Sequence, residues 1–439
     1  MLAAPKGFCK AEDVCENGLM PQFVYTFLLF LILPFVPLKL LWRGIKQPEY
    51  LQHWRERFGF YEVNTSKPLI WLHCVSVGET RAAAPLIKQL LTQYPHYQIL
   101  LTHTTPTGRA TSEQLFGDSV LRAYLPYDVP FAVNRFLRHF KPHIGLLMET
   151  ELWFNLIRAC DKANIALFLL NARLSEKSAL GYAKLGRLVT QNLQKLTLIA
   201  AQTADDERRF KLLGASQTTV AGNLKFDATP PDNSLALGLS MRQCLGEQRM
   251  IFVAASTREG EESMILDTVA GLKLLTIIVP RHPQRFDEVA QLLTSRHIPY
   301  VLRSDLNTAN LNTSITADTQ VVLGNSMGEL YTYYAACDFA FIGGSLLKFG
   351  GQNLIEAASM GKPILIGKYT YNFADATVAA VKCGAALQVQ DVADLRANLQ
   401  HLIDHPKKRE DMALAARNFS QASTGAAVRM LQMIQQHLN

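Results

Sequence analysis

Several motifs that mark metal, cofactor or disulfide chemistry are absent from this 439-residue sequence. Its seven cysteines are scattered and form no C-x-x-C pair, so they indicate reduced thiols of a cytosolic domain, not a disulfide framework or a zinc site. No two aspartates stand two positions apart, which leaves no D-x-D element to hold a divalent metal on a diphosphate. No G-x-x-x-x-G-K-[S/T] occurs either, and this disfavours a P-loop nucleotide hydrolase.

Charged residues and long apolar stretches are also scarce. Charged residues make up 18% of the chain and hydrophobic residues 49%, a balance that excludes disorder for most of it. The net charge of +7 is mild and diffuse; it fits an anionic substrate or a membrane surface and does not indicate a nucleic-acid binder. Only one apolar run is long enough for a membrane span, which excludes a polytopic membrane protein, and the length predicts two or three domains.

That apolar run lies near the N-terminus. Residues 17–38 carry no charge and are just long enough for a spanning helix, although Pro34 and Pro37 are expected to break or kink it. No small-residue cleavage site follows, so we expect an uncleaved anchor. A helix that lies on the bilayer is the alternative, and both alternatives place the protein at a membrane. A start of translation at Met20 in place of Met1 is also compatible with the sequence.

Basic residues are concentrated after the run. Those that follow it are Lys39, Arg43, Lys46, Arg55 and Arg57, whereas only Lys6 and Lys10 precede it. By the positive-inside rule this asymmetry predicts that the bulk of the protein faces the cytoplasm. Together with Trp42 and Trp54, the same cations are suited to anionic lipid headgroups.

From residue 68 onward, short β-rich apolar runs alternate with helical patterns. Such alternation predicts βα units around a parallel sheet that is buried on both faces. The predicted strands of the first series are 69–72, 98–101, 120–124, 144–148, 165–170 and 196–201. This alternation stops at a Pro-Pro-Asp-Asn linker, 229–234, and a second series of strand and helix patterns follows the linker. The predicted strands of the second series are 250–254, 276–279, 300–302, 321–323, 339–342 and 363–366, with only helices after Asp391.

The sequence therefore predicts an α/β protein with two Rossmann-like domains that face each other across a cleft. We expect an N-terminal segment and anchor over 1–42, a first domain over 43–228, and a second domain with C-terminal helices over 235–439. Ligands of open α/β sheets bind beyond the carboxyl ends of the strands, so two such domains suggest a site for two substrates between them.

Two acidic segments follow predicted strands of the first domain. Glu79 stands where a helix begins after the strand that contains His73, and a carboxylate there is placed to accept a proton from a substrate hydroxyl. Glu149 and Glu151 follow another apolar strand and are suited to hold a sugar hydroxyl or orient a base. Helix capping is the alternative role for these carboxylates. His73 itself is expected in the core, and Lys225 is either a cation of the cleft or a solvated side chain.

Turns from strand to helix in the second domain are suited to anions. Ser256, Thr257 and Arg258 stand in one such turn, where a helix start offers free N–H groups. After the next strand, Pro280 fixes a turn that makes Arg281 available to a phosphate or a carboxylate.

A glycine-rich segment gives the strongest pattern. The glycines in 343–345 and 350–351 let the backbone approach a phosphate, and the helix expected from Asn353 offers unpaired N–H groups. Glu356, one turn later, is placed to accept hydrogen bonds from ribose hydroxyls, and 327–329 begin another helix that can supply base or ribose contacts. The spacing is not G-x-G-x-x-G, so a dinucleotide site is poorly supported.

In this order along the chain, the motifs resemble those of the 3-deoxy-D-manno-octulosonic acid (Kdo) transferases of lipopolysaccharide assembly. The segments that carry the resemblance are 71–81, 148–153, 222–227, 257–262, 280–285, 327–330 and 350–356. It covers nearly everything from Met20 onward, including the anchor and residues 56–59 behind it.

This resemblance implies a GT-B glycosyltransferase that works without metal or cofactor and inverts the configuration at the transferred sugar. The implied activity moves Kdo from CMP-Kdo to the 6'-hydroxyl of the tetraacyldisaccharide lipid A precursor (lipid IVA), at the cytoplasmic face of the inner membrane. The implied partners are therefore the CMP-Kdo donor, the lipid A precursor and inner-membrane lipids, with no nucleic acid.

Site residues are carried over by position. Glu79 matches the general base and Glu151 a second important carboxylate. The expected donor-binding residues include those of the turn after the first strand of the second domain, which is suited to anions. The full set is Ser256, Arg258, Pro280, Arg281, Met327, Gly328, Glu329, Asn353, Leu354, Ile355 and Glu356.

Three positions depart from the usual family pattern. Gln352 stands in place of a His, and Leu354 and Phe154 each stand in place of a Pro. Glutamine donates a hydrogen bond but does not titrate, so the sequence supports no role for a charged imidazole there. The glycines and Glu356 are intact, so we expect nucleotide binding.

Residues and resemblance converge on one mechanism. Glu79 takes the proton of the attacking hydroxyl, and Arg281 with the helix starts at Ser256 and Asn353 stabilises the departing CMP in place of a metal. The alternatives are a related sugar-nucleotide epimerase or hydrolase and a membrane-tethered nucleotide-binding scaffold. The anchor argues against the first alternative, and the two carboxylates of one cleft, Glu79 and Glu151, argue against the second.

Overall fold

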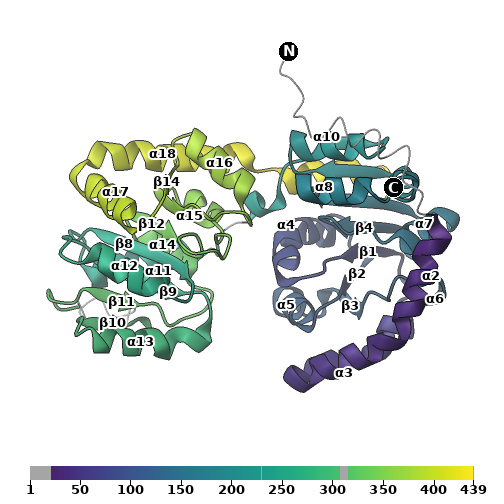
Figure 1. The fold of residues 1–439 in the computed structure, drawn as a ribbon, viewed down its shortest axis with the longest axis horizontal. Helices are drawn as coiled ribbons and strands as arrows, with labels where there is room; N and C mark the ends of the chain where they lie inside the picture. Colours follow the sequence, from purple (N-terminus) through teal and green to yellow (C-terminus); the bar gives the residue numbers. More distant parts are fainter. Residues whose placement is uncertain (1–20, 229, 307–314, 439) are drawn as a thin grey trace, which may run out of the picture. The chain divides into compact units, whose positions relative to one another are not determined.

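Two compact α/β units make up the protein (Figure 1). The computed structural model describes residues 21–228, 230–306 and 315–438. The first unit comprises the described residues up to Ala228 together with those from Thr424, and the second unit lies between Thr229 and Ser423. Each unit contains one sheet of seven parallel strands, which confirms the predicted class of two Rossmann-like domains.

The first sheet has the order β3-β2-β1-β4-β5-β6-β7. Its strands are β1 (Leu69–His73), β2 (Gln98–His103), β3 (Leu121–Tyr124), β4 (Ile144–Met148), β5 (Ala166–Ala172), β6 (Leu198–Ala201) and β7 (Thr218–Val220). Strand β1 pairs with β2 on one side and with β4 on the other, with His73 beside Leu147. The strand order therefore reverses between β1 and β4, the point where open α/β sheets bind ligands.

Helices cover both faces of this sheet. They are α4 (Val77–Gln93), α5 (Pro106–Phe116), α6 (Pro130–Phe140), α7 (Phe154–Lys162), α8 (Glu176–Ala183), α9 (Arg187–Leu193), α10 (Ala204–Leu212) and α19 (Ala426–Gln435). Successive residues of a strand point to opposite faces. Accordingly, Trp71 packs with residues of α6, α7 and α9, whereas Ile70 and Leu72 pack with residues of α4 and α19.

The second sheet has the order β10-β11-β9-β8-β12-β13-β14. Its strands are β8 (Ile251–Thr257), β9 (Leu275–Pro280), β10 (Tyr300–Leu302), β11 (Val321–Leu323), β12 (Phe339–Ile342), β13 (Ile364–Gly367) and β14 (Ala386–Val389). Its helices are α11 (Ser234–Leu245), α12 (Glu261–Val269), α13 (Phe286–Ser295), α14 (Leu330–Ala336), α15 (Ile355–Ser359), α16 (Ala374–Lys382), α17 (Val392–Asp404) and α18 (Pro406–Ser423). The order reverses between β8 and β12, so this unit has the same kind of switch point.

Three features differ from the prediction. The second domain does not include the end of the chain, because α19 packs its apolar face against α4 in the core of the first unit. The edge strands β7 and β14 were not predicted; they have three and four residues, too few for a clear alternation. The helical pattern between the strands predicted at 165–170 and 196–201 forms two helices, α8 and α9, because Gly186 adopts a φ of 50° between them.

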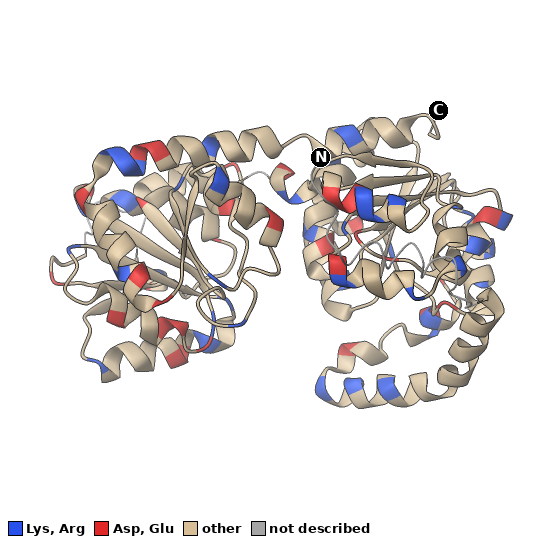
Figure 2. Ribbon diagram, turned by 45° about the horizontal axis from the view of Figure 1, so that its top comes forward, with Lys and Arg blue, Asp and Glu red and all other residues tan. Residues whose placement is uncertain are grey.

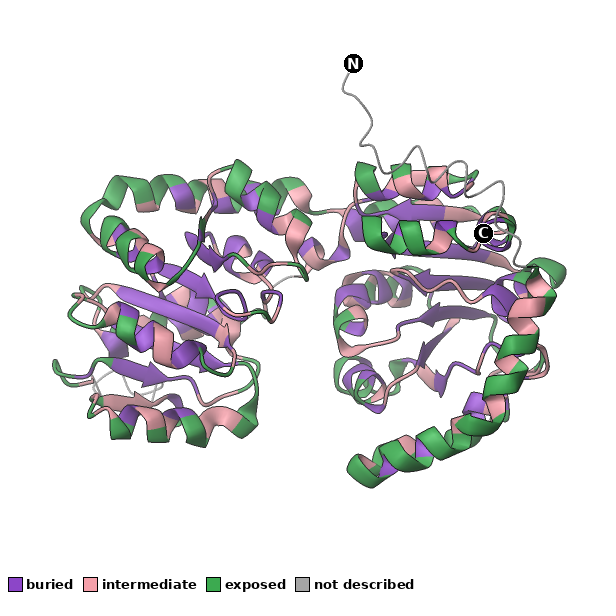
Figure 3. Ribbon diagram, viewed as in Figure 1, coloured by how far each residue is buried: buried purple, intermediate pink, exposed green. Residues whose placement is uncertain are grey.

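The N-terminal apolar run forms a bent helix. It consists of α2 (Gln22–Ile32), the 3₁₀ turn η1 (Leu33–Phe35) and α3 (Val36–Lys46), so the predicted break falls at the two prolines. This helical stretch is long and apolar enough to cross a membrane. Most of it is exposed (Figure 3), from Phe23 with 73% of its surface to Ile45 with 81%. Basic residues lie along α3 (blue in Figure 2), including Arg43 and Lys46 in its last turn.

A carboxylate fixes α19 to the first unit, and its removal should destabilise that unit. Asp227 accepts hydrogen bonds from the N–H groups of Gly425 (2.6 Å) and Ala427 (2.5 Å) at the start of the helix. We expect Asp227→Ala to lower the free energy of unfolding by about 1–2 kcal/mol, because the first turn loses its cap. Asp227→Asn should recover part of this loss.

The free energy of unfolding is measured by denaturant titration of the full-length chain. Asp205→Ala is the matched control, because that carboxylate is 68% exposed and pairs with Arg208 on its own helix. Equal losses in the two alanine variants would contradict the capping role of Asp227.

Candidate functional site

The switch point of the first sheet brings three carboxylates to one edge. Glu79 lies in the first turn of α4, which directly follows β1. Glu149 and Glu151 lie in the segment between β4 and α7. Because β1 and β4 are neighbours, their carboxyl ends place both predicted catalytic residues, Glu79 and Glu151, at the same edge of the sheet.

Glu79 caps its helix and remains partly exposed. Its Oε2 accepts a hydrogen bond from the Val75 N–H at 2.7 Å, and its Oε1 accepts one from the Ser76 hydroxyl at 3.2 Å. The Ser76 oxygen in turn accepts the Glu79 N–H at 3.4 Å. The capping role that the sequence left open is therefore present, and it holds the carboxylate in a fixed position at the sheet edge.

The surroundings of Glu79 disfavour its ionised form. Burial, together with the charges of Glu149 and Glu151, raises the pKa of Glu79 from 4.5 to about 8, against the hydrogen bonds from Val75 and Ser76. Burial also raises the pKa of Glu151, whose Oε2 accepts the Trp153 indole N–H at 2.7 Å. A carboxylate with a pKa near neutrality is suited to general base catalysis.

The backbone at Glu149 is strained. Its φ of 58° is left-handed, a conformation that costs a non-glycine residue about 1–3 kcal/mol and is found mostly at functional sites. The Lys225 ammonium lies 3.7 Å from the Glu149 carboxylate, so this lysine belongs to the acidic site. Of the two alternatives for Lys225, this contact favours a cation that acts at the site over a solvated side chain.

His73 is a neutral core residue, which confirms the expectation. It is fully buried, its Nδ1 lies 2.9 Å from the Thr102 hydroxyl, and burial lowers its pKa to about 3. It is therefore uncharged at neutral pH.

Cations gather at the switch point of the second sheet. Ser256, near the end of β8, has a left-handed φ of 57°, which parallels Glu149 in the first unit. The Arg281 N–H donates to the Thr257 carbonyl at 3.0 Å, so the turn after β9 adjoins the turn after β8. The Arg258 guanidinium lies 3.0 Å from His282, whose pKa is lowered by burial and then by the charges of Arg258, Arg281 and Arg285. This cationic surrounding is suited to an anion.

In the glycine turn at 343–345, where we expect the backbone to approach a phosphate, a carboxylate of the protein already accepts backbone N–H groups. The buried carboxylate of Glu261 accepts the N–H groups of Gly344 (2.6 Å), Ser345 (3.0 Å) and Leu346 (3.0 Å). It also accepts the Arg258 N–H at 2.9 Å. Glu261 thus occupies the place expected for an anion and ties the turn after β12 to the turn after β8. The sequence signal for this role is an acidic pair, Glu261 and Glu262, directly after Gly260.

The second glycine segment keeps its predicted character. Gly350 and Gly351 have φ values of 91° and 74°, which only glycine adopts without strain. Helix α15 begins at Ile355, two residues after the predicted start, and the Asn353 Oδ1 accepts the Ile355 N–H at 3.0 Å. The Asn353 amide also donates to the Glu356 carboxylate at 3.1 Å, so these two predicted donor contacts form one unit.

The remaining predicted donor residues lie in three places. Leu354 and Ile355 are buried at the start of α15, and Pro280 is buried at the end of β9. Met327 is exposed, Gly328 has a φ of 82°, and Glu329 pairs with Arg303 at 2.8 Å.

The segment 327–329 lies near α15. Tyr331 follows it, and the pKa of Tyr331 is raised by burial and by the charge of Glu356. The structure therefore brings both ribose-contact candidates to one region of the second unit. Among the described residues, no group of three or more His, Cys, Asp or Glu side chains is arranged to hold a metal ion.

Comparison with known proteins identifies the family. A sequence profile described as "3-Deoxy-D-manno-octulosonic-acid transferase (kdotransferase)" matches residues 52–228, and one described as "Glycosyl transferases group 1" matches 304–419. The chain is 37% identical to the 3-deoxy-D-manno-octulosonic acid transferase of Haemophilus influenzae over 95% of this chain and 99% of that one. It is 39% identical to the enzyme of the same name from Bordetella pertussis, over 87% of this chain and 91% of that one.

A solved structure supports the fold. A putative UDP-N-acetylglucosamine 2-epimerase from Listeria monocytogenes matches with a TM-score of 0.55, over 85% of this chain and 97% of that one. At 15% identity this likeness shows the fold alone. With the glycosyltransferase profile it confirms the GT-B fold class, and the Haemophilus influenzae relative, at 37% identity, is more similar in sequence than this epimerase, at 15%. The chain belongs to the 3-deoxy-D-manno-octulosonic acid transferases, a family of glycosyltransferases.

Proposed function

We propose that this transferase moves Kdo from CMP-Kdo to the 6'-hydroxyl of the tetraacyldisaccharide lipid A precursor, without metal and with inversion at the transferred sugar. The observation that carries the proposal is the Glu79 carboxylate, partly exposed at the switch point of the first sheet, with its pKa raised to about 8. A base of this pKa accepts a proton from an attacking hydroxyl near physiological pH.

In the proposed step, the acceptor oxygen forms a bond to the anomeric carbon of Kdo while the bond from that carbon to the CMP phosphate oxygen breaks. The hydroxyl proton passes to Glu79, and the electron pair of the broken bond leaves with CMP. One displacement inverts the configuration at that carbon. Closure around the substrates would keep water from replacing the acceptor.

Glu149 and Glu151 act on Glu79 through their charge. Both raise its pKa, and Glu151 is oriented by the Trp153 indole. Their proposed role is to tune the base and to accept hydrogen bonds from sugar hydroxyls. Lys225 offsets part of the negative charge at Glu149.

The second unit carries the proposed donor site. CMP-Kdo has a phosphate and a carboxylate, and the cations Arg258 and Arg281 suit such a donor. Arg258 also stacks on the Phe349 ring at 4.7 Å, which orients its guanidinium. Asn353 and Glu356 are proposed to contact the ribose. Preorganised cations of this kind stabilise a departing phosphate as a metal would.

The proposed location is the cytoplasmic face of the inner membrane. The exposed apolar surface of α2 and α3 supports membrane association, and the cations that follow α2 support a cytoplasmic orientation. An epimerase of the same fold has no need for this surface, and this difference favours a lipid acceptor.

Removal of the proposed base should abolish most transfer. We expect Glu79→Gln to lower kcat about 10²–10⁴-fold with little change in CMP affinity, since it removes only the proton acceptor. Full-length protein in detergent is incubated with CMP-Kdo and the lipid A precursor, with and without chelator. CMP release and the mass of the lipid are measured.

Glu176→Gln is the control, because Glu176 also lies in the first turn of a helix and is exposed. A lipid that gains Kdo in the wild type and in the control, with or without chelator, fits the proposal. CMP release without a heavier lipid would indicate a hydrolase or another acceptor. No CMP release would overturn the proposal.

The raised pKa of Glu79 predicts a pH-dependent stability. The unfolded carboxyl releases its proton near 4.5 and the folded one near 8, so the folded state binds more protons in between. The contribution of Glu79 to stability is therefore full below pH 4.5 and falls as the pH rises to about 8. We expect Glu79→Gln to gain stability relative to the wild type between pH 5 and 8. Thermal unfolding over this range tests it, and a constant difference would contradict the raised pKa.

Glu261 should be required for an intact donor site. Glu261→Ala leaves four backbone N–H groups without their acceptor, at a cost of about 1–3 kcal/mol for each one that stays buried and unsatisfied. We expect a lower free energy of unfolding and at least tenfold weaker CMP binding, measured by calorimetry. Glu259→Ala is the control, because its side chain is exposed two residues earlier. Unchanged CMP affinity in the folded Glu261→Ala protein would contradict this role.

A further inference from the structure

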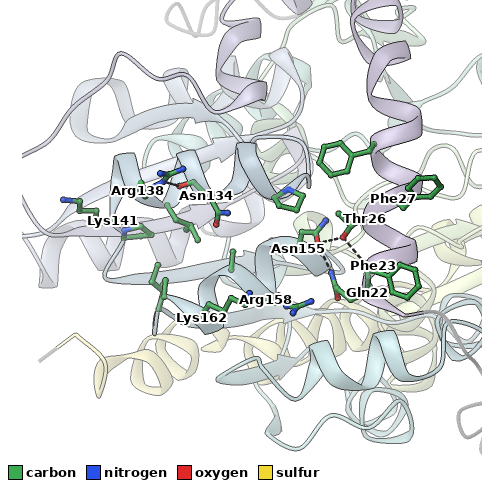
Figure 4. A pocket seen from close by; sticks show the side chains of 17 residues that line it. Gln22, Phe23, Thr26, Phe27, Asn134, Arg138, Lys141, Asn155, Arg158 and Lys162 are labelled. Atoms are coloured by element: carbon green, nitrogen blue, oxygen red, sulfur yellow. Dashed lines mark hydrogen bonds between the residues drawn. The ribbon is translucent and has the colours of Figure 1, made fainter.

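A pocket lies beside the N-terminal helix, away from the acidic site. It has a volume of about 1,220 Å³, more than the ~300–1,000 Å³ of a typical small-molecule site. Helices α2, α6 and α7 of the first unit form its walls (Figure 4). None of the three catalytic-site carboxylates lines it.

The two sides of the pocket have opposite character. Exposed phenylalanines of α2, Phe23 and Phe27, lie on one side in Figure 4, and basic side chains from α6 and α7 lie across from them. The basic residues of the lining are Arg138, Lys141, Arg158 and Lys162. Among the 17 residues that line the pocket, none is acidic. The pocket therefore matches an amphiphile with an anionic head and an apolar body.

These four cations are available to a ligand. All four residues are exposed, and among residues 21–228 no carboxylate lies within ion-pair distance of any of them. Arg138 and Lys162 lie in the last turns of α6 and α7 and Lys141 directly follows α6, where a cation interacts favourably with the helix dipole. The helix dipoles explain cations at the end of each helix. They do not explain why four cations without nearby carboxylates gather beside an apolar helix.

Hydrogen bonds hold the apolar wall in place. Gln22 and Thr26 of α2 both donate to the Asn155 Oδ1 of α7, at 2.9 and 2.8 Å. The Tyr25 hydroxyl donates to Asp128 at 2.8 Å. The start of α2 is thus fixed to α7, so its phenylalanines and the cations of α7 face one ligand together.

The acidic site lies at the other edge of the sheet. Lys141 and Lys162 precede β4 and β5, whereas Glu79 and Glu151 follow β1 and β4. The five residues of β4, at ~3.3 Å each, separate the two edges by roughly 15 Å. A head group bound by the lysines is therefore not the reacting group.

We propose that this pocket binds an anionic glycerophospholipid of the bilayer, with its phosphate at the four cations and its acyl chains along α2. The bound lipid fixes α2 in the membrane interface beside α7. The proposal rests on membrane association of α2 and not on Kdo transfer, so the two fail separately.

The test compares lipid binding of full-length variants. The protein is reconstituted with vesicles of phosphatidylcholine alone or with phosphatidylglycerol, and the bound fraction is measured by flotation. Arg158→Gln/Lys162→Gln should weaken binding to phosphatidylglycerol vesicles about 25-fold, from about 5-fold for each cation near an anionic surface, and leave binding to phosphatidylcholine vesicles unchanged. The matched control is Lys88→Gln/Lys408→Gln, which removes two exposed charges outside the pocket.

The other outcomes overturn the proposal. Equal losses in the two double variants would mean diffuse charge attraction and no pocket. A raised KM for the lipid acceptor in neutral detergent, without weaker vesicle binding, would make the pocket an acceptor subsite. Unchanged vesicle binding together with an unchanged KM for the lipid acceptor would mean that the pocket binds no lipid. Kdo transfer in detergent, measured alongside, reports on the proposed function independently.

Discussion

Carboxylates that accept hydrogen bonds from backbone N–H groups join the loops and helix starts on which the candidate sites of this protein depend. Asp128 accepts the N–H groups of Asn155 and Leu156, Glu261 accepts those of the glycine turn, and Asp227 accepts those at the start of α19. A buried carboxylate is costly unless such donors surround it, and the donors are equally costly without an acceptor. Each of these contacts therefore joins segments that the strand order alone would leave free to vary.

Glu79 also accepts a hydrogen bond from a backbone N–H group, but its surroundings raise its pKa. The Val75 N–H holds its carboxylate in place, but burial and two nearby carboxylates work against its charge. The result is a carboxyl group that is held in a fixed position and whose pKa is raised. Stability and basicity therefore oppose each other at this one side chain, as is common at active sites.

The N-terminal helix combines two surfaces. Gln22, Tyr25 and Thr26 of α2 form a polar stripe that bonds to the first unit, and the remaining residues of α2 are apolar and mostly exposed. A helix that crosses the bilayer freely has no need of such a stripe, because polar groups in hydrocarbon require partners. The docked start of α2 thus favours the interfacial alternative for this end of the helix.

By itself the sequence determined the class and order of the elements, because the alternation of apolar runs and helical patterns is a local property. It also determined the family, since the motifs stand in a specific order. Only the tertiary structure decided which donors each carboxylate meets: Glu261 reaches Gly344 across 83 residues, and Asp227 reaches Gly425 across 198. The assignment of α19 to the first unit and the occupation of the glycine turn depend on these distant contacts. No spacing rule encodes them, because they arise only when the sheets bring remote strand ends together.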